Sequence, residues 1–175
     1  MRLVEGTASV ADVDAFVADL AAIGDEHGCT VQAFDARYVA DREHLETALR
    51  HADRAFERGE NVARDRGVEV LCYAAGRRQI DRALAMGVEE GETPAVVLVA
   101  AEETDGDATA ADASRAEDAA AEAVAARLES GPGLDATDEE RVREFFEVGD
   151  AELAATDAGL AALVAERVAL LDVET

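Results

Sequence analysis

Residues 68–88 read VEVLCYAAGRRQIDRALAMGV and hold the strongest local signals in the chain. The run 68–73 is rich in β-branched and aromatic residues, which predicts an inner strand of a sheet. Gly76 then marks a turn, and Gly87 marks the end of a short helix. The apolar residues of that helix are Ile80, Ala83 and Leu84. The stretch therefore predicts a strand, a turn and a helix in succession.

Other short apolar runs, at residues 2–6, 29–34 and 95–100, predict further strands. Strands alternate with helices up to residue 100, and helices dominate after it. This order favours an α/β or α+β fold, with a central sheet of about four or more strands, helices packed on it and a helical C-terminal part. We expect one domain over residues 1–175.

Capping residues delimit several of the expected helices. Ser9 is expected to begin the first helix, with Asp12 as its capping acid. Asp41 is expected to begin the second helix, which ends at Gly59. Thr137 is expected to cap a later helix. Each of these helices has apolar residues at helical spacing, which predicts that one face packs against the sheet.

The last helix carries a strongly apolar face, formed by Leu160, Leu163, Val164, Val168 and Leu171. Most of this face must belong to the core, but it is more apolar than a surface helix in an acidic chain requires. We therefore expect a partner-binding surface on this helix, at Leu163, Val168, Leu170 and Leu171. A role in the core alone is the alternative.

The composition indicates an intracellular setting. No run of about 18 apolar residues occurs, so no membrane-spanning segment is expected, and residues 1–7 lack the basic start and apolar stretch of a signal peptide. Cys29 and Cys72 lie in apolar runs without metal-ligand spacing, which is typical of buried thiols in a reducing compartment. Residues 102–113, before a helix expected over 114–128, are a low-complexity run that predicts an acidic, solvated loop. We expect a cytoplasmic protein.

Motifs for catalysis are missing from the sequence. It contains no phosphate-binding loop, nucleophile elbow, HExxH motif or zinc-deaminase signature. His44 and His51 are seven residues apart on one predicted helix, which separates them by roughly 10 Å, too far to share one metal ion. We expect them to be helix-surface groups. The sequence therefore gives no case for an enzyme, a metal, a cofactor or a small-molecule substrate.

The charges are unevenly distributed. The net charge is −24, lysine is absent and all 16 basic residues are arginine. An excess of acids keeps a protein soluble where salt screens charge, so it indicates a very salty cytoplasm; an acidic interaction surface is the alternative. Residues 35–82 hold ten arginines and ten acids, so the entire net charge lies outside this segment.

Two groups of arginines stand out within residues 35–82. Arg50, Arg54 and Arg58 recur every four residues, which places them in a stripe on one helix face, although ordinary ion pairing along the helix is the alternative. Arg77 and Arg78 open a helix, where cations are unfavourable unless an anion binds between them and the helix N-terminus. Pairing with nearby acids is the alternative there. Gln79 offers an amide to a base edge or a backbone group.

These residues resemble a known family. The line from residue 68 to 88, with its Arg78-Gln79-Ile80 motif, is similar to the central signature of the TPRKB-like subunit of the KEOPS complex. The stretches 32–36, 44–55 and 166–173 are also similar, so the resemblance covers most of the chain except about residues 102–135. The composition is that of a halophilic archaeal member.

The resemblance implies a non-catalytic accessory subunit. Members of this family bind the atypical kinase/ATPase subunit of KEOPS, and archaeal members also bind tRNA at its 3′ CCA end. The assembly makes threonylcarbamoyladenosine beside the anticodon. On this basis, tRNA recognition is expected to centre on Arg77, Arg78 and Gln79, with Asn61 and the stripe of Arg50, Arg54 and Arg58 nearby.

Other functions remain to be weighed against this one. A purely structural or regulatory binder of the kinase subunit, without tRNA binding, is the first alternative. An unrelated small enzyme is the second, and the missing catalytic residues argue against it.

Overall fold

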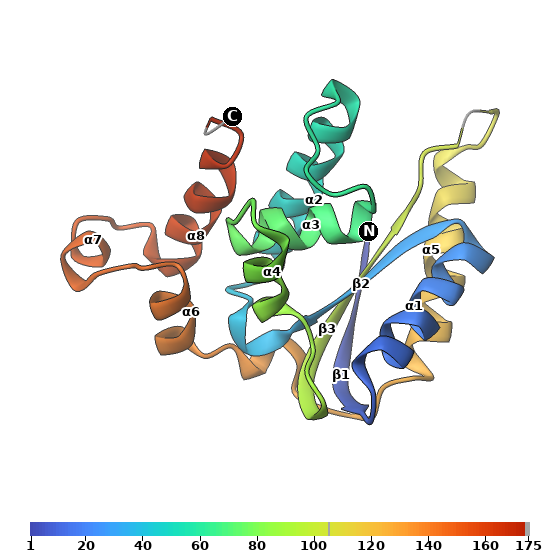
Figure 1. Ribbon diagram of the computed structural model, residues 1–175, viewed down its shortest axis with the longest axis horizontal. Helices are drawn as coiled ribbons and strands as arrows, with labels where there is room; N and C mark the ends of the chain where they lie inside the picture. Colours follow the sequence, from blue (N-terminus) through green and yellow to red (C-terminus); the bar gives the residue numbers. More distant parts are fainter. Residues whose placement is uncertain (105, 174–175) are drawn as a thin grey trace. The chain divides into compact units, whose positions relative to one another are not determined.

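The helices and strands of the chain fall into units that each combine separate stretches of sequence. A computed structural model describes residues 1–104 and 106–173 (Figure 1). One unit, the sheet unit, consists of Met1–Asp35 and Val88–Gly133, and the other, the helical unit, consists of Ala36–Gly87 and Leu134–Thr175. The expected α+β class is confirmed. The expectation of one domain over residues 1–175 stays a prediction.

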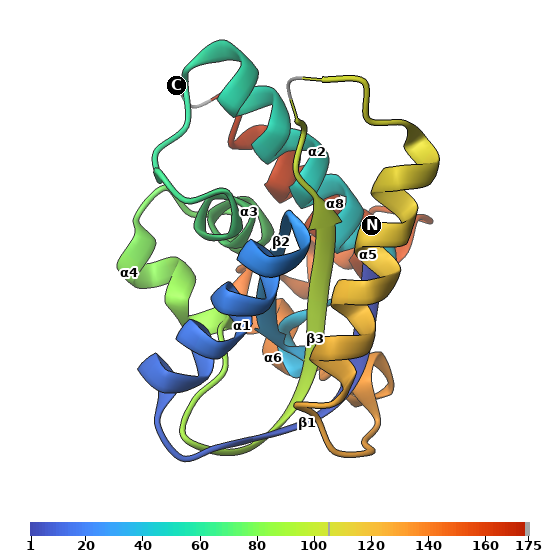
Figure 2. The ribbon, with the colours of Figure 1, turned by 90° about the vertical axis from the view of Figure 1, so that its right-hand side faces the viewer.

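The sheet unit is built on three antiparallel strands, β1 (Arg2–Val10), β2 (Cys29–Asp35) and β3 (Gly91–Ala101), in the order β1-β3-β2. The run of valines and alanines in β3 suits a central strand with neighbours on both sides. Helices α1 (Val13–His27) and α5 (Ala110–Ala125) pack side by side on one face (Figures 1 and 2). Their core includes Leu20, Ile23, Val97, Val99, Ala120 and Val124.

The start of α1 corrects the sequence-based expectation. Ser9 is the penultimate residue of β1 and pairs with Glu92 of β3. Asp12 is the N-cap itself, and its carboxylate accepts a hydrogen bond of 2.9 Å from the amide of Ala15. The prediction that Ser9 begins the helix is wrong because pairing with β3 extends β1 to Val10.

The helical unit is organised around α2 (Arg42–Arg58), α3 (Arg66–Ala75) and α8 (Gly159–Leu170), each of which packs against the other two. The predicted ends of α2 are confirmed: Asp41 accepts from the amide of His44 at 2.8 Å, and Gly59 has the left-handed φ of 67°. The remaining helices of this unit are α4 (Ile80–Ala83), α6 (Glu139–Phe145) and α7 (Asp150–Ala154), with short 3-10 turns at Ala36–Tyr38 and Leu84–Met86.

The run 68–73 is helical, so the strand predicted there is wrong. It lies within α3, which Asp65 caps at its N-terminus and Gly76 ends with a φ of 60°. Eight of its ten residues are buried. A short apolar run suits a buried helix as well as a buried strand, because neither has a polar face that would reveal its period. Within the described residues the sheet consequently has three strands.

Two further helix starts differ from those expected. Thr137 does not cap α6; Asp138 does, and the Thr137 hydroxyl donates instead to the carbonyls of Val39 and Leu134. Helix α5 begins at Ala110 rather than 114, because Thr109 and Asp112 form a capping box. The predicted loop over 102–113 therefore ends earlier, and its residue 105 lies outside the described residues.

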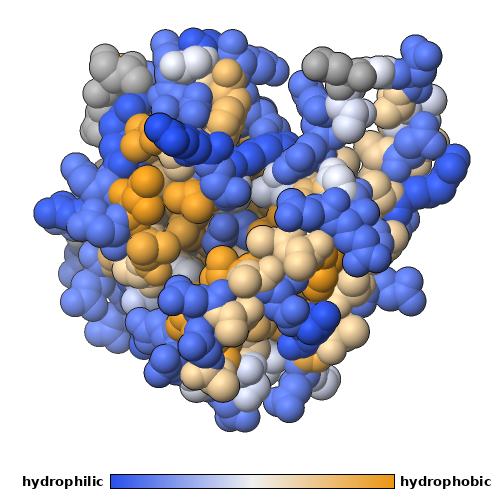
Figure 3. All heavy atoms as spheres, turned by 45° about the vertical axis from the view of Figure 1, so that its right-hand side comes forward, coloured by the Kyte–Doolittle hydropathy of each residue, from blue (hydrophilic) through white to orange (hydrophobic). Residues whose placement is uncertain are grey.

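The surface is predominantly hydrophilic, with some hydrophobic patches, on the face shown in Figure 3. Among the described residues, none of the helices combines the length and the apolar composition that crossing a membrane requires.

Replacing Gly24 by Ala tests the packing of α1 against β2. Alanine inside a helix is normally about 1 kcal/mol better than glycine, but here the added Cβ would lie 2.4 Å from the carbonyl oxygen of Cys29. We expect Gly24→Ala to lower the free energy of unfolding by about 2 kcal/mol, measured by urea titration. Gly106→Ala is the control, because a Cβ there has no neighbour within 4 Å. Equal stability of the two variants would contradict the steric explanation.

Candidate functional site

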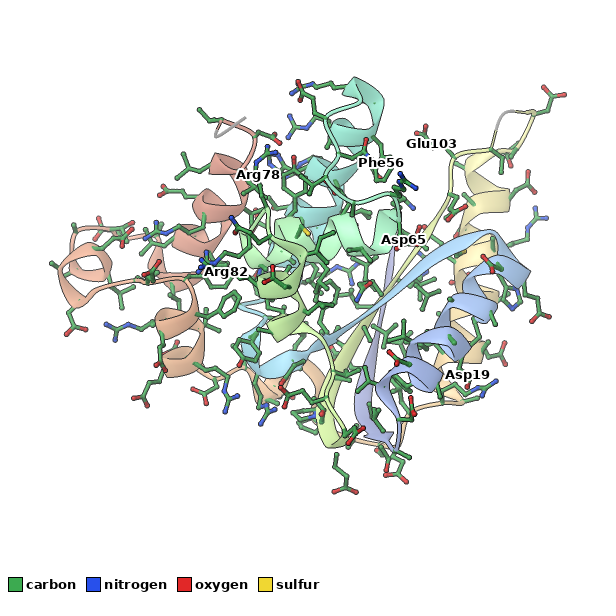
Figure 4. All side chains as sticks on the ribbon, viewed as in Figure 1. Asp19, Phe56, Asp65, Arg78, Arg82 and Glu103 are labelled. Atoms are coloured by element: carbon green, nitrogen blue, oxygen red, sulfur yellow. The ribbon has the colours of Figure 1, made fainter. Side chains whose placement is uncertain are left out.

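Side chains from α2, from α3 and from the loop after α3 converge on the turn after α8. They are His51 and Arg54 on α2, Tyr73 on α3, and Arg78 in the loop. Arg78 is labelled in Figure 4. Just after α8 these side chains meet the carbonyl of Leu171 and the carboxylate of Asp172. We call His51, Arg54, Tyr73, Arg78 and Asp172 the α8-end cluster. All of it lies within the helical unit.

Asp172 is the hub of the α8-end cluster. One carboxylate oxygen lies 2.5 Å from Nδ1 of His51, and the other accepts a hydrogen bond of 2.7 Å from the Tyr73 hydroxyl. Burial acts to raise the pKa of Asp172, but the hydrogen bonds from Tyr73 and His51 outweigh it, and the pKa is lowered. Burial and the bond to Asp172 raise the pKa of Tyr73 well above its usual range. Asp172 is therefore ionised and Tyr73 is the proton donor.

Only some of the hydrogen-bond donors of Arg54 and Arg78 have partners in the cluster. The Arg78 guanidinium donates through one terminal nitrogen to the Leu171 carbonyl at 3.1 Å. A terminal nitrogen of Arg54 lies 3.3 Å from both ring nitrogens of His51. The Nε atoms of Arg54 and Arg78 are buried and have no hydrogen-bond partner among the described residues. The site therefore contains two donors that a suitable acceptor would satisfy.

Both histidines of α2 are buried, so the expectation that they are helix-surface groups is wrong. Nδ1 of His44 accepts from the amide of Ala40 at 3.1 Å, and Nε2 lies 2.7 Å from the carbonyl of Ala74. This pairing fits a neutral imidazole with its proton on Nε2. Burial lowers the pKa of His44, and the Ala74 carbonyl and Asp41 oppose the shift only in part. The histidines could have been recognised as core residues, because they share helical spacing with the buried alanines of α2.

Arg77 and Arg78 both donate to carbonyls near helix C-termini. Arg77 donates to the Phe145 carbonyl of α6 at 2.8 Å, and its guanidinium lies 5.2 Å from the centre of the Phe145 ring. Arg78 donates to the carbonyl of Leu171, which follows α8. Cations are favourable at these ends because the carbonyls carry partial negative charge. In the described structure, the arginines therefore bind helix ends rather than acids.

The other predicted RNA-binding residues lie at the end of the loop between α3 and α4, along α2 and just after α2. Gln79 is exposed and occupies the N-cap position of α4 without a side-chain cap bond. Arg50 is exposed and donates to the Thr47 hydroxyl at 3.3 Å. Arg58 lies 4.0 Å from Glu60, and the Asn61 amide donates to the Ala63 carbonyl at 2.8 Å. The contacts thus place Arg54 and Arg78 in the α8-end cluster. Arg58 ends α2, and Asn61 follows it outside the cluster.

A groove of 490 Å³ runs between α2 and α8. Arg50 and His51 line it from α2, and alanines line it from α8. Its acidic lining residues are Asp41, Glu43 and Glu166. Because His51 belongs to both the groove and the α8-end cluster, the groove leads from Arg50 to the cluster. No group of three or more side chains suited to a metal ion occurs among the described residues.

The residues expected to bind a partner have different exposures. Leu163, Val168 and Leu171 are buried, whereas Leu170 is 50% exposed. Val173, one turn beyond, is 76% exposed. Ile80 of α4 and Leu84 after it are also exposed hydrophobic residues. The apolar surface available to a partner is therefore at the end of α8 and along α4.

The comparisons with known proteins identify one family. The model of the family described as Kinase binding protein CGI-121 matches residues 9–172, which include the whole α8-end cluster. No curated protein matches the chain.

Replacing His44 by Gln tests whether the buried imidazole is neutral. The pKa of His44 is lowered from 6.5 in the folded state, so the unfolded state takes up a proton first as the pH falls. The stability that the neutral His44 contributes is therefore complete above the unfolded-state pKa of 6.5, and it is lost as the pH falls from there toward the folded-state pKa. We expect His44→Gln to be less stable than the unaltered protein at about pH 7 but to lose stability less steeply toward about pH 5, measured by urea unfolding. Parallel pH profiles would contradict this.

Proposed function

Because the chain belongs to the CGI-121 family of kinase-binding proteins, we propose that it is a non-catalytic accessory subunit of the KEOPS complex. In this proposal it binds the atypical kinase/ATPase subunit and recruits tRNA by its 3′ CCA end. The complex then modifies the tRNA to threonylcarbamoyladenosine, and the transfer itself takes place on another subunit. The resemblance of residues 68–88 to the KEOPS subunit supports the finer part of the proposal.

The observation that carries the RNA-binding part is the meeting of Arg54 and Arg78 at the α8-end cluster, beside a groove that Arg50 lines. All three arginines lie in residues 35–82, the segment without net charge in a chain whose net charge is −24. Gln79 is exposed next to Arg78, and Arg82 is exposed on α4 (Figure 4). Arginine forks suit phosphate oxygens, and an amide suits a base edge.

The mechanism of RNA binding follows from the charge of the protein. Long-range attraction is weak for a strongly acidic chain, and in molar salt the screening length is about 3 Å. Binding must then depend on direct contacts, which are guanidinium–phosphate hydrogen bonds and stacking of unpaired nucleotides. It should therefore persist in salt, unlike binding that is driven by counterion release.

The alternative is a binder of the kinase subunit that does not bind tRNA. One observation favours it: the guanidinium groups of Arg77 and Arg78 already donate to the carbonyls of Phe145 and Leu171. In that case the arginines serve to fix α6 and α8, and kinase binding is the whole function.

Gln79→Ala distinguishes tRNA binding from kinase binding alone. The Gln79 side chain is exposed and makes no cap bond, so its loss should not disturb the fold. We expect it to weaken binding of tRNA ending in CCA by about fivefold, the effect of losing one hydrogen bond, and to leave tRNA without CCA unaffected. Binding is measured by fluorescence anisotropy in molar salt. Arg50→Ala should weaken the binding of both tRNAs. The control is Arg115→Ala, at an exposed arginine of the sheet unit, and it should leave the binding of both tRNAs unchanged. Failure of the unaltered protein to bind tRNA would favour the alternative.

Leu170→Asp tests the kinase-binding surface. Leu170 is 50% exposed, so the substitution should leave the fold intact while it places a charge in the apolar contact. We expect at least a tenfold loss of affinity for the kinase subunit in a titration, on the order of 1.4 kcal/mol or more. Val17→Asp is the matched control, since Val17 of the sheet unit is 52% exposed. If both variants retain full affinity, the end of α8 is not the interface.

A further inference from the structure

The turn after α8 offers the α8-end cluster acceptors like those of an RNA phosphate. Asp172 presents an ionised carboxylate, with its oxygens 2.5 Å from His51 Nδ1 and 2.7 Å from the Tyr73 hydroxyl. The Leu171 carbonyl accepts from Arg78 at 3.1 Å. An anionic oxygen pair and a neutral acceptor therefore already lie among the cluster's donors.

These acceptors do not satisfy the cluster. The buried Nε atoms of Arg54 and Arg78 have no partner among the described residues. A carboxylate has two oxygens, and both oxygens of Asp172 are engaged by His51 and Tyr73. A phosphate is larger than a carboxylate and carries more acceptor positions, so it can accept from several guanidinium donors at once. The cluster is thus better matched to a phosphate than to the carboxylate it holds.

We propose that the Asp172 carboxylate occupies the α8-end cluster as an internal competitor, so that an RNA phosphate binds there in exchange for it. This inference rests on the proposed binding of tRNA and adds its regulation. Asp172 leaves the cluster by rotation of its own side chain, which is 20% exposed, while the buried Leu171 stays in place. Arg78 keeps its bond to the Leu171 carbonyl and turns its unpartnered Nε to the phosphate.

The exchange gives selectivity against weak anions. Any ligand must replace the two short hydrogen bonds of the Asp172 carboxylate, and a monovalent inorganic anion offers too few contacts to do so. A nucleotide chain adds stacking and further contacts along the groove lined by Arg50. In a salty cytoplasm, Asp172 therefore keeps chloride from occupying the arginines.

Asp172→Asn tests the competition, because it keeps an acceptor for Tyr73 and removes the charge. We expect this variant to bind tRNA ending in CCA about tenfold more tightly than the unaltered protein does, the effect of removing one competing charged hydrogen bond. Tyr73→Phe, which releases one oxygen of Asp172 without removing the ring, should tighten binding by about threefold. Asp157→Asn, an exposed acid ahead of α8, makes the same charge change and should leave the affinity within about twofold.

Inorganic pyrophosphate provides a second probe that does not depend on RNA recognition. Its binding, followed through the NMR signals of His51, should also tighten in Asp172→Asn. Weaker or unchanged binding of pyrophosphate and tRNA in both cluster variants would overturn the inference and make Asp172 a positioning residue for the arginines. If pyrophosphate binds more tightly to Asp172→Asn but no variant binds tRNA, the competition stands and the proposed tRNA recruitment fails.

Discussion

The burial of α3 is the constraint on which the helical unit depends. Helices α2, α4 and α8 all pack on it, and a helix enclosed in this way must find partners for its backbone groups within the protein. His44 does so for the carbonyl of Ala74 at 2.7 Å. The left-handed Gly76 then ends the helix and directs the following arginines to the ends of α6 and α8. Packing of one apolar segment thus positions the candidate site.

The arginines of this unit combine structural and binding roles. Arg78 connects the loop after α3 to α8, and Arg77 connects it to α6. A guanidinium can do this and still present other donors, because it has five N–H groups in one plane. An ammonium group would have to use its donors around a single nitrogen. A chain without lysine is therefore able to keep helix ends fixed and retain donors for a ligand.

The parts of the fold marked by local signals were predictable, and those that depend on distant contacts were not. Asp41 and Gly59 delimit α2 as expected, because capping depends on residues within one turn. The helix α3 was misread as a strand because its apolar run has no period to detect, although Asp65 and Gly76 frame it. The motif at Arg77–Gln79 was singled out from the sequence, but its residues precede α4 rather than open it, and their role in RNA binding stays a prediction. The contact of His51 with Asp172 was not predicted, since 121 residues separate them in the sequence.

The state of the cysteines has a practical consequence for spectroscopy. Both Cys29 and Cys72 are buried, and burial together with the nearby Glu69 carboxylate raises the pKa of the Cys72 thiol to about 11. Alkylating reagents attack the thiolate, so the native thiols react slowly at neutral pH. A cysteine introduced at an exposed position such as Ala108 would then be labelled selectively, without removal of the native ones. Fluorophores or spin labels can thus be attached to the otherwise unaltered chain.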